Sequence, residues 1–482
     1  MMLDPHTCYR ALCARDARFD GRFFVAVSST RIYCRPVCTV KPPRRENCRF
    51  YPSAAAAESA GYRPCLRCRP ELAPGNASID ATKRLAQAAA NLLEDRALEE
   101  EGLVPLAARL GITDRHLRRV FKTEFGVSPI QFAQTQRLLL AKHLLTDTKL
   151  PITEIAFASG FASVRRFNAL FRERYRLQPG RLRRHAPACR SSDALTFELS
   201  FRPPYDWEAL LAFLNGRAIA GVEAAGAHGY LRTVRILHGG KEHRGWIEVA
   251  PSKKKPALRV MVAASLARAL PPLLSRVKTL MDLACNPVEI GQALGALARR
   301  RPGLRVPGAF DGFEVAVRAI LGQQISVAAA RTLAGRFATA FGEPLKTPYP
   351  TLTMLFPTAE QIAALAPRQI ARIGLPAKRA CALRAIARAL ADGDIHLAPD
   401  ADVEVTLERL RALPGIGEWT AQYLAMRALA WPDAFPHTDY GVKKAMQLDD
   451  HKRVLAAADA WRPWRAYATM HLWQSLAKEG AA

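Results

Sequence analysis

Hydrophobic and polar residues alternate along residues 195–265, which is the pattern of half-buried β-strands. The apolar alternation is clearest in the segments ALTFELSF, YLRTVRILHGG, HRGWIEVA and ALRVMVAA. Gly239 and Gly240 follow the second segment and suit a tight hairpin turn, whose central residues need positive φ. The sequence therefore predicts a small α+β domain with an antiparallel sheet here.

Helical periodicity dominates on both sides of this stretch. Residues 80–185 are rich in Ala, Leu and Arg, and helical spacing returns from residue 267 with Pro and Gly between the periods. Breaks at residues 73–76 and 185–194 indicate linkers. The chain is thus predicted to be multidomain and mainly α, with domains at 1–75, 80–185, 195–280 and 281–482. We expect the second linker to tether two independently folded halves.

The helical region 80–185 contains two short helix pairs with a glycine at each turn. Thr113 follows Gly111 and can cap a helix over 114–125, and Ser163 follows Gly160 and can cap another helix. Each second helix has one apolar face and one basic or polar face. The candidate DNA-contacting residues on these faces are Arg115, Arg118, Arg119, Arg165, Arg166 and Asn168.

A helix packed by one face and basic on the other suits the major groove of DNA, although a basic helix pair in any bundle has the same pattern. Two such units in succession are more specific than one. Residues 80–185 resemble the AraC family of transcription regulators. The resemblance implies two recognition helices that read successive major grooves, with RNA polymerase as a further candidate partner.

Composition favours a nucleic-acid partner. The chain has 482 residues, and 70 Lys and Arg against 43 Asp and Glu give a net charge of +27. Such an excess favours a polyanion, although a composition bias toward Arg would also produce it. There is neither an 18-residue apolar run nor a secretory leader at the start, so we expect a cytoplasmic protein without a membrane partner.

Four of the ten cysteines form two close pairs, Cys34 with Cys38 and Cys65 with Cys68. Two such pairs on separate loops can hold one tetrahedral Zn²⁺ through four thiolates, and clustered cysteines in a reducing compartment favour metal over disulfides. Cys48 lies between the pairs and is an alternative ligand. The site could be purely structural, or its thiolates could act as nucleophiles.

Residues 20–72 resemble the N-terminal domain of the Ada methylation-response regulators, through the CRPVC turn, REN, FY and RPCLRC. The resemblance implies that the zinc cage binds DNA and that Cys34 accepts a methyl group from a methylphosphotriester. Full-length Ada proteins carry a second methyltransferase centre, Pro-Cys-His-Arg, and that tetrapeptide does not occur here. Direct repair of O6-methylguanine is therefore not expected.

Methylation would change the charge of the cage. Converting one thiolate to a thioether removes one negative charge, worth roughly 2–3 kcal/mol per phosphate at about 5–8 Å before salt screening. Repair could thus raise promoter affinity. Five basic residues near the cage are candidate phosphate contacts: Arg31, Arg35, Lys41, Arg44 and Arg45.

A tight hairpin lies near the C-terminus, at Pro414-Gly415-Ile416-Gly417. Gly415 and Gly417 allow a DNA backbone to approach, and the N–H groups that open the next helix can bind a phosphate. Asp439 follows about twenty residues later, after an aromatic-Pro loop. This combination resembles the helix-hairpin-helix DNA glycosylases.

Residues 195–482 resemble the AlkA-type 3-methyladenine DNA glycosylases, through FRPPYDW, RPGLRVPGAFDGFE, RAILGQQISVAAA and WRPWRAYATMHLW. The resemblance implies an all-α glycosylase domain with Asp439 as the catalytic carboxylate. It also implies that Trp419, Tyr423 and Trp473 surround the flipped base. Gln324 falls where that family inserts an apolar wedge into the base stack.

The chemistry of base release suits these residue types. Cleavage of an N-glycosidic bond makes the sugar positive, which a nearby carboxylate stabilises, and alkylated purines are cations that aromatic rings attract. No lysine occupies the hairpin position used by glycosylase-lyases, where Gln422 and Tyr423 stand, so we expect hydrolysis without strand cleavage. Two alternatives remain: that Asp439 serves only as a helix cap, and that the chain is a regulator whose glycosylase fold is a DNA clamp.

Overall fold

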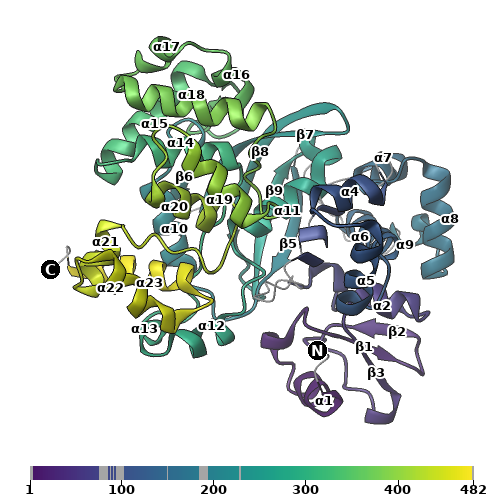
Figure 1. Ribbon diagram of the computed structural model, residues 1–482. Helices are drawn as coiled ribbons and strands as arrows, with labels where there is room; N and C mark the ends of the chain where they lie inside the picture. The colour runs from purple at the N-terminus through teal and green to yellow at the C-terminus, as the bar shows by residue number, and fades with distance from the viewer. Residues whose placement is uncertain are drawn as a thin grey trace.

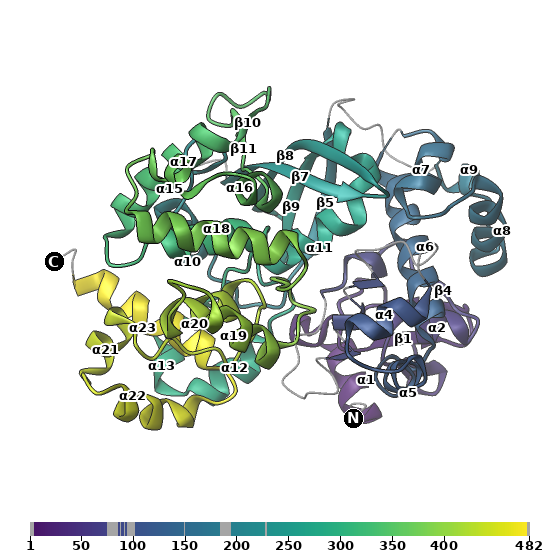
Figure 2. The same ribbon diagram turned by 45° about the horizontal axis from the view of Figure 1, so that its top comes forward.

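The computed structural model describes residues 4–74, 85–86, 88–90, 92–93, 102–148, 150–183, 194–226 and 229–479. The N-terminal segments lie on one side of a central sheet, and the C-terminal helices lie on the other (Figure 1). A view turned by 45° shows the same order (Figure 2). The predicted multidomain, mainly helical fold class is confirmed. Within the described residues, no helix has both the length and the apolar character needed to cross a membrane.

The N-terminal unit is a four-stranded sheet with helices against it. The strands run in the order β3-β1-β2-β4, and β4 pairs with β2 in parallel. Ser53 caps α2 by accepting a hydrogen bond from the amide of Ala56 at 3.0 Å. The elements are α1 (Pro5–Cys13), β1 (Phe24–Val27), β2 (Ile32–Cys34), β3 (Cys48–Tyr51), α2 (Ala54–Ser59) and β4 (Arg63–Pro64), with 3₁₀ turns at Ala17–Phe19, Arg45–Asn47 and Pro70–Leu72.

The next unit is a helical array built around α6. Ser128 and Gln131 form a capping box that starts this long helix. The start of the predicted helical region, residues 80–101, lies largely outside the described residues. The helices are α4 (Leu103–Arg109), α5 (Asp114–Phe125), α6 (Pro129–Asp147), α7 (Ile152–Ala158), α8 (Val164–Tyr175) and α9 (Pro179–Arg183).

The predicted antiparallel sheet is present and has five strands in the order β5-β9-β8-β7-β6. Gly239 and Gly240 have φ of +57° and +68° and join β7 to β8, as their sequence predicts. The sequence pattern does not predict the short strand β6 or the helix α10. The elements are β5 (Ala194–Ser200), α10 (Trp207–Gly216), β6 (Glu223–Gly226), β7 (Gly229–His238), β8 (Lys241–Pro251), β9 (Ala257–Ala263), a 3₁₀ turn (Ala264–Ala269) and α11 (Leu270–Leu280).

The C-terminal unit is helical apart from one short strand pair, β10 (Glu343–Pro344) with β11 (Met354–Leu355). Its hairpin lies between α19 and α20, and Asp439 immediately precedes α21. Its helices are α12 (Pro287–Leu294), α13 (Ala296–Arg299), α14 (Gly312–Leu321), α15 (Val327–Phe341), α16 (Ala359–Ala363), α17 (Pro367–Ala371), α18 (Ala377–Ala391), α19 (Val403–Ala412), α20 (Glu418–Arg427), α21 (Tyr440–Met446), α22 (His451–Ala458) and α23 (Arg465–Glu479), with a 3₁₀ turn at Asp459–Trp461.

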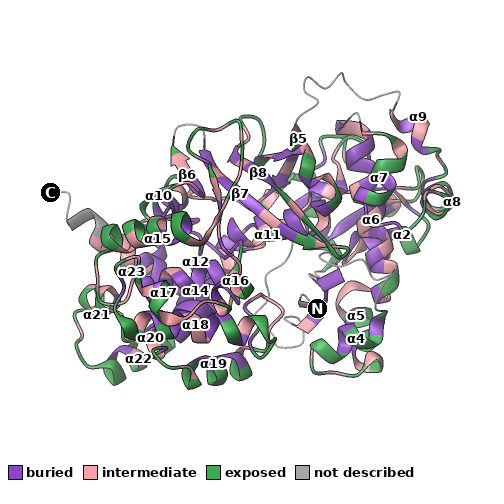
Figure 3. Ribbon diagram, turned by 90° about the horizontal axis from the view of Figure 1, so that it is seen from above, coloured by how far each residue is buried: buried purple, intermediate pink, exposed green. Residues whose placement is uncertain are grey.

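The two halves of the chain share a hydrophobic core, which the expectation of a simple tether did not include. One continuous cluster of buried side chains runs from Leu138 of α6 through the five-stranded sheet to Met470 of α23. Figure 3 shows buried positions, in purple, along both α6 and the sheet. Contact at this boundary excludes water from apolar surface on both halves, so the halves form one packed body.

Candidate functional site

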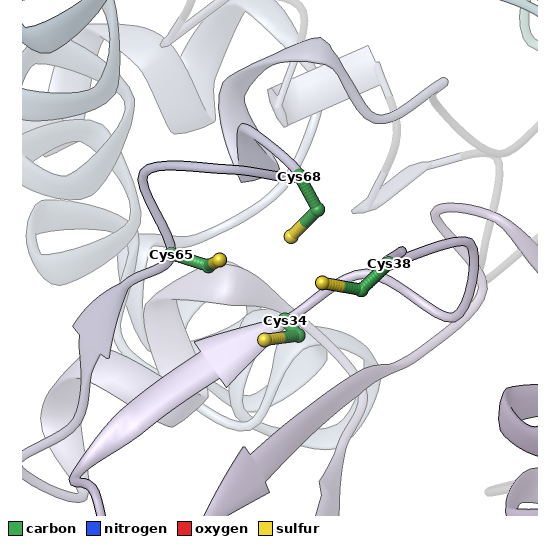
Figure 4. A group of neighbouring side chains, drawn as sticks. All are labelled: Cys34, Cys38, Cys65 and Cys68. Atoms are coloured by element: carbon green, nitrogen blue, oxygen red, sulfur yellow. The ribbon is translucent and has the colours of Figure 1, made fainter. Parts of the chain in front are cut away.

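The four predicted zinc ligands lie together at one end of the N-terminal sheet. Cys34 ends β2 and Cys65 follows β4, so the parallel pairing of these strands brings the two cysteine pairs side by side. Their sulfur atoms point toward a common centre (Figure 4) and lie within 4.8 Å of one another. Four Zn–S bonds of about 2.3 Å require sulfur atoms about 3.8 Å apart, so the arrangement fits a tetrahedral zinc site.

The protonation of these thiols also fits a metal site. Hydrogen bonds with the neighbouring thiols raise the pKa of Cys34 and lower the pKa of Cys65. Four sulfurs this close cannot all ionise without a cation, and Zn²⁺ supplies that charge. The alternative ligand Cys48 does not belong to the cluster, and its thiol instead donates to the carbonyl of Arg44 at 3.4 Å.

The four sulfurs differ in access. Cys38 and Cys65 are buried, whereas Cys34 and Cys68 are half-buried. The backbone N–H of Arg35 donates to Cys68 Sγ at 3.3 Å. Among the described residues, no backbone hydrogen bond to Cys34 Sγ is found. A hydrogen bond of this kind stabilises a thiolate, so the two half-buried sulfurs have different surroundings.

One of the five basic residues expected to hold phosphates near the cage is not available. Arg35 is only 5% exposed, and its guanidinium forms an ion pair with buried Asp20. A buried charge of this kind needs its partner and has no free donor for DNA. Arg31, Lys41 and Arg44 are exposed.

The two candidate recognition helices have the predicted caps. Thr113 Oγ1 accepts from the amide of His116 at 3.2 Å, and Ser163 Oγ accepts from the amide of Arg166 at 3.2 Å. The apolar faces of α5 and α8 are buried. On the opposite faces, Asn168 is half-buried. All five predicted arginines are exposed: Arg115, Arg118, Arg119, Arg165 and Arg166.

Asp439 is held by three N–H donors. Its Oδ1 accepts from the amide of Val442 at 2.9 Å and from Nε1 of Trp473 at 2.9 Å, while Oδ2 accepts from Nε1 of Trp419 at 2.7 Å. The first bond makes Asp439 the N-cap of α21, as the alternative reading proposed. The two indole bonds do not belong to a helix cap, and they fix the plane of a half-buried carboxylate beside two large rings.

The predicted aromatic residues lie around this carboxylate. The rings of Trp419 and Tyr423 stack at 5.2 Å with an interplanar angle of 12°, and Tyr423 lies 6.4 Å from Trp473. Phe213 of α10 lies nearly parallel to Trp473, at 6.4 Å and 17°. Phe213 comes from the preceding sheet domain, far away in the sequence, so no local signal could assign it to this site.

Arginines lie behind the aromatic cluster, and sequence reasoning missed them as well. Arg427 Nη1 donates to the hydroxyl of Tyr423 at 2.8 Å, and the Arg217 guanidinium lies 3.8 Å from the centre of the Phe213 ring. Burial acts to raise the pKa of Tyr423, but Arg427, Arg217 and Arg318 outweigh it and lower that pKa. The hydroxyl end of Tyr423 is thus fixed by positive charge.

The hairpin glycines have different roles in the structure. Gly415 has φ of +78°, and a Cβ there would lie 2.8 Å from Ala382 Cβ, so packing within the protein requires glycine. A Cβ on Gly417 would meet no atom within 4 Å. Gly417 therefore leaves open space at the start of α20, where no side chain caps the first N–H groups of the helix.

Gln324 lies exposed on the turn between α14 and α15, with φ of +57°. Positive φ is uncommon for a residue other than glycine. Its neighbour Gln323 donates from Nε2 to the carbonyl of Gly415 at 2.9 Å and to Thr420 Oγ1 at 3.1 Å. The turn that carries Gln324 is therefore fastened to the hairpin.

Four family models match successive parts of the chain. They are the metal binding domain of Ada (residues 7–71), a helix-turn-helix domain (106–185), the AlkA N-terminal domain (196–311) and the HhH-GPD superfamily of base excision DNA repair proteins (317–453). A Mycobacterium tuberculosis protein named "Probable bifunctional transcriptional activator/DNA repair enzyme AlkA" is 38% identical over 98% of this chain and 97% of its own length.

The chain belongs to this AlkA-type bifunctional family. Two Escherichia coli relatives each match one half. "DNA-3-methyladenine glycosylase 2" is 38% identical over 58% of this chain and 96% of its own length. "Bifunctional transcriptional activator/DNA repair enzyme Ada" is 38% identical over 30% of this chain and 40% of its own length. The family has a zinc-binding unit, a helix-turn-helix regulator and a glycosylase fold, and zinc is its cofactor here.

Proposed function

We propose that this protein releases alkylated purines, including 3-methyladenine and 7-methylguanine, from double-stranded DNA and also senses methylphosphotriesters to regulate transcription. The observation that carries the first activity is Asp439, whose carboxylate is oriented by Trp419 and Trp473 inside an aromatic cluster. A carboxylate serving only as a helix cap has no use for two indole donors. This geometry favours a working glycosylase over the alternative of a DNA clamp.

The proposed base release starts with a nucleotide that leaves the stack, because the reacting bond is inaccessible inside a duplex. Gly417 and the opening N–H groups of α20 hold the backbone phosphate, and Gln324 fills the space that the base leaves. The base then lies against Trp419, Tyr423 and Trp473. Cation–π contact with a positive alkylated base contributes about 0.5–2 kcal/mol for each ring.

Asp439 then stabilises the positive charge that develops on the deoxyribose as the glycosidic bond breaks. A water molecule supplies the new oxygen at the sugar, and the base leaves with the bonding electrons. Gln422 occupies the position at which a lysine would start strand cleavage, and its Nε2 donates to Glu418 at 3.0 Å. The product is therefore an abasic site in an intact strand.

We further propose that Cys34 accepts a methyl group in the zinc unit. Zinc, when bound by the four cysteines, keeps Cys34 as a thiolate at neutral pH. The sulfur attacks the methyl carbon, a S–C bond forms, and the C–O bond breaks with its electron pair left on the phosphate. The net charge of the cage then changes from about −2 to about −1. Less repulsion from phosphates strengthens promoter binding through α5 and α8, and RNA polymerase is the proposed downstream partner.

The test uses one preparation of the full chain. Duplex DNA with 3-methyladenine should lose the base in the wild type and not in Asp439→Asn. Duplex DNA with a labelled methylphosphotriester should transfer its label to the wild type and not to Cys34→Ser. Base release that is equal in Asp439→Asn and wild type would overturn the glycosylase proposal, and a wild type without label would overturn the sensor proposal.

A further inference from the structure

The zinc cage is the meeting point of the three parts of the molecule. Two arginines immediately follow cysteines of the cage: Arg35 is buried, and Arg69 is half-buried. Arg35 reaches the glycosylase half, and Arg69 reaches the helix-turn-helix unit. Both side chains make contacts that depend on the conformation of the loops that carry the cysteines.

Arg35 connects the cage to the end of β5. Its backbone N–H donates to Cys68 Sγ, and its Nη1 donates to the carbonyl of Cys68 at 3.2 Å. Its Nη2 donates to Ser200 Oγ at 3.0 Å. Ser200 is the last residue of β5 and only 7% exposed. One side chain thus bonds both a ligand loop of the cage and a buried strand of the other half.

The strand end at Ser200 leads toward the aromatic cluster. Just beyond it, Arg202 Nη1 donates to the carbonyl of Ala284 at 2.8 Å, and Arg305 Nη2 donates to the carbonyl of Arg202 at 2.6 Å. The chain then enters α10, which carries Phe213 against Trp473. A displacement of Ser200 would therefore be passed to a wall of the base site through a short segment that these hydrogen bonds hold in place.

Arg69 makes the second connection. Its Nη2 forms an ion pair with Asp147 of α6 at 2.7 Å and lies 3.1 Å from Nδ1 of His143. The His143 ring stacks on Phe197 of β5 at 4.7 Å. Lys142, also on α6, donates to the carbonyl of Cys65 at 3.4 Å. Polar contacts thus join the loop of Cys65 and Cys68 to α6, and a ring contact joins α6 to β5.

We propose that Arg35 is a positioning residue that couples the zinc cage to the glycosylase half through Ser200. Zinc fixes the loop of Cys65 and Cys68, the fixed loop holds Arg35, and Arg35 holds the end of β5. By linkage, occupation of the base site must stabilise the zinc-bound cage by the same factor. The inference relies on the proposed lesion binding by the glycosylase half, but it assigns a role that this activity does not require.

The test measures the zinc affinity of the full chain by equilibrium competition with a chromophoric chelator. The chain is free, bound to an undamaged duplex, or bound to the same duplex with a tetrahydrofuran abasic site. Fluorescence anisotropy of the two duplexes is measured alongside. In the wild type, the abasic duplex should raise the zinc affinity by about fivefold relative to the undamaged duplex, within the usual range of such couplings.

Ser200→Ala should abolish this difference while the abasic duplex still binds more tightly. Thr196→Ala removes a hydroxyl from an exposed position of the same strand and should behave as the wild type. Hydrogen exchange of the wild type gives a second measurement, in which zinc removal should increase exchange in β5 and α10.

The outcomes separate the two proposals. A wild type with no preference for the abasic duplex would contradict lesion binding. A wild type that prefers the abasic duplex but has the same zinc affinity in both complexes would overturn the coupling. Unchanged exchange in β5 and α10 after zinc removal would overturn it as well, whether or not Ser200→Ala folds.

Discussion

The zinc cage and the Asp439 site both place negative charge at a proposed DNA surface, but they stabilise that charge in different ways. The cage gathers four thiols from two loops within residues 34–68 and depends on an added cation. Asp439 is held by three N–H groups of the protein itself, from residues 419, 442 and 473. The residues of the first site lie close together in the sequence and depend on a metal ion. The residues of the second site are brought together by the packing of helices that are distant in the sequence.

Removing zinc should affect the two sites most differently. Structural zinc sites contribute about 10–16 kcal/mol, so Cys38→Ala or chelation should disorder the cage and abolish methyl transfer to Cys34. Base release should stay within about tenfold of the wild type, because Asp439 has donors from the chain, and couplings between sites are usually modest. Zinc content, labelled methyl transfer and base release measured on one sample test this, and loss of all base release would contradict it.

Asp439→Asn is the reverse experiment. The amide cannot carry the negative charge, and its NH₂ group faces either an indole N–H or the amide of Val442. Base release should fall by about 100-fold or more, as expected for loss of an electrostatic stabiliser of the transition state. Zinc content should stay at one ion per chain, which serves as the control for folding of the N-terminal half.

These two sites also differ in how far the sequence predicts them. The spacing of the cysteines, the caps at Thr113 and Ser163 and the alternating strands are local signals, and the structure contains them all. Phe213 reaches the Asp439 site only through the packing of α10 on the helical unit, whereas Arg427 lies on α20 itself, four residues after Tyr423. The buried ion pair of Arg35 and the core shared by the two halves are also products of tertiary contact, which local periodicity does not encode.

Glu58 differs from Asp439 because its carboxylate accepts hydrogen bonds from hydroxyl groups rather than from N–H groups. It is buried between α2, α6 and α8, and it accepts from Tyr33 at 3.0 Å, Tyr175 at 3.2 Å and Thr135 at 2.9 Å. Burial raises the pKa of Glu58 from 4.5 to about 7. Its contribution to stability is therefore full below pH 4.5 and is lost as the pH rises through about 7.

Glu58→Gln should remove this pH dependence, because the amide keeps hydrogen-bonding groups for its partners and does not ionise. Each pH unit in that window corresponds to about 1.4 kcal/mol. The variant should be more stable than the wild type at pH 8 and close to it at pH 4.5. Hydrogen exchange of α2 and α6 at several pH values measures the effect, and parallel pH profiles for the two proteins would contradict it.

Replacing a tryptophan by phenylalanine separates the role of the indole N–H group from that of the ring, and we expect this change to have the weakest effect on base release. Trp419→Phe keeps an aromatic face for Tyr423 but removes the donor to Oδ2 of Asp439. Base release should slow by about tenfold or more, in keeping with about 1.5 kcal/mol or more for one hydrogen bond to a charged group. The loss should lie in kcat rather than in KM, because the donor acts on the charge that stabilises the transition state. Trp473→Phe should lower kcat in the same way through Oδ1. A higher KM with an unchanged kcat in both variants would mean that the tryptophans act only as walls for the base, and Asp439 would then depend on its helix cap alone.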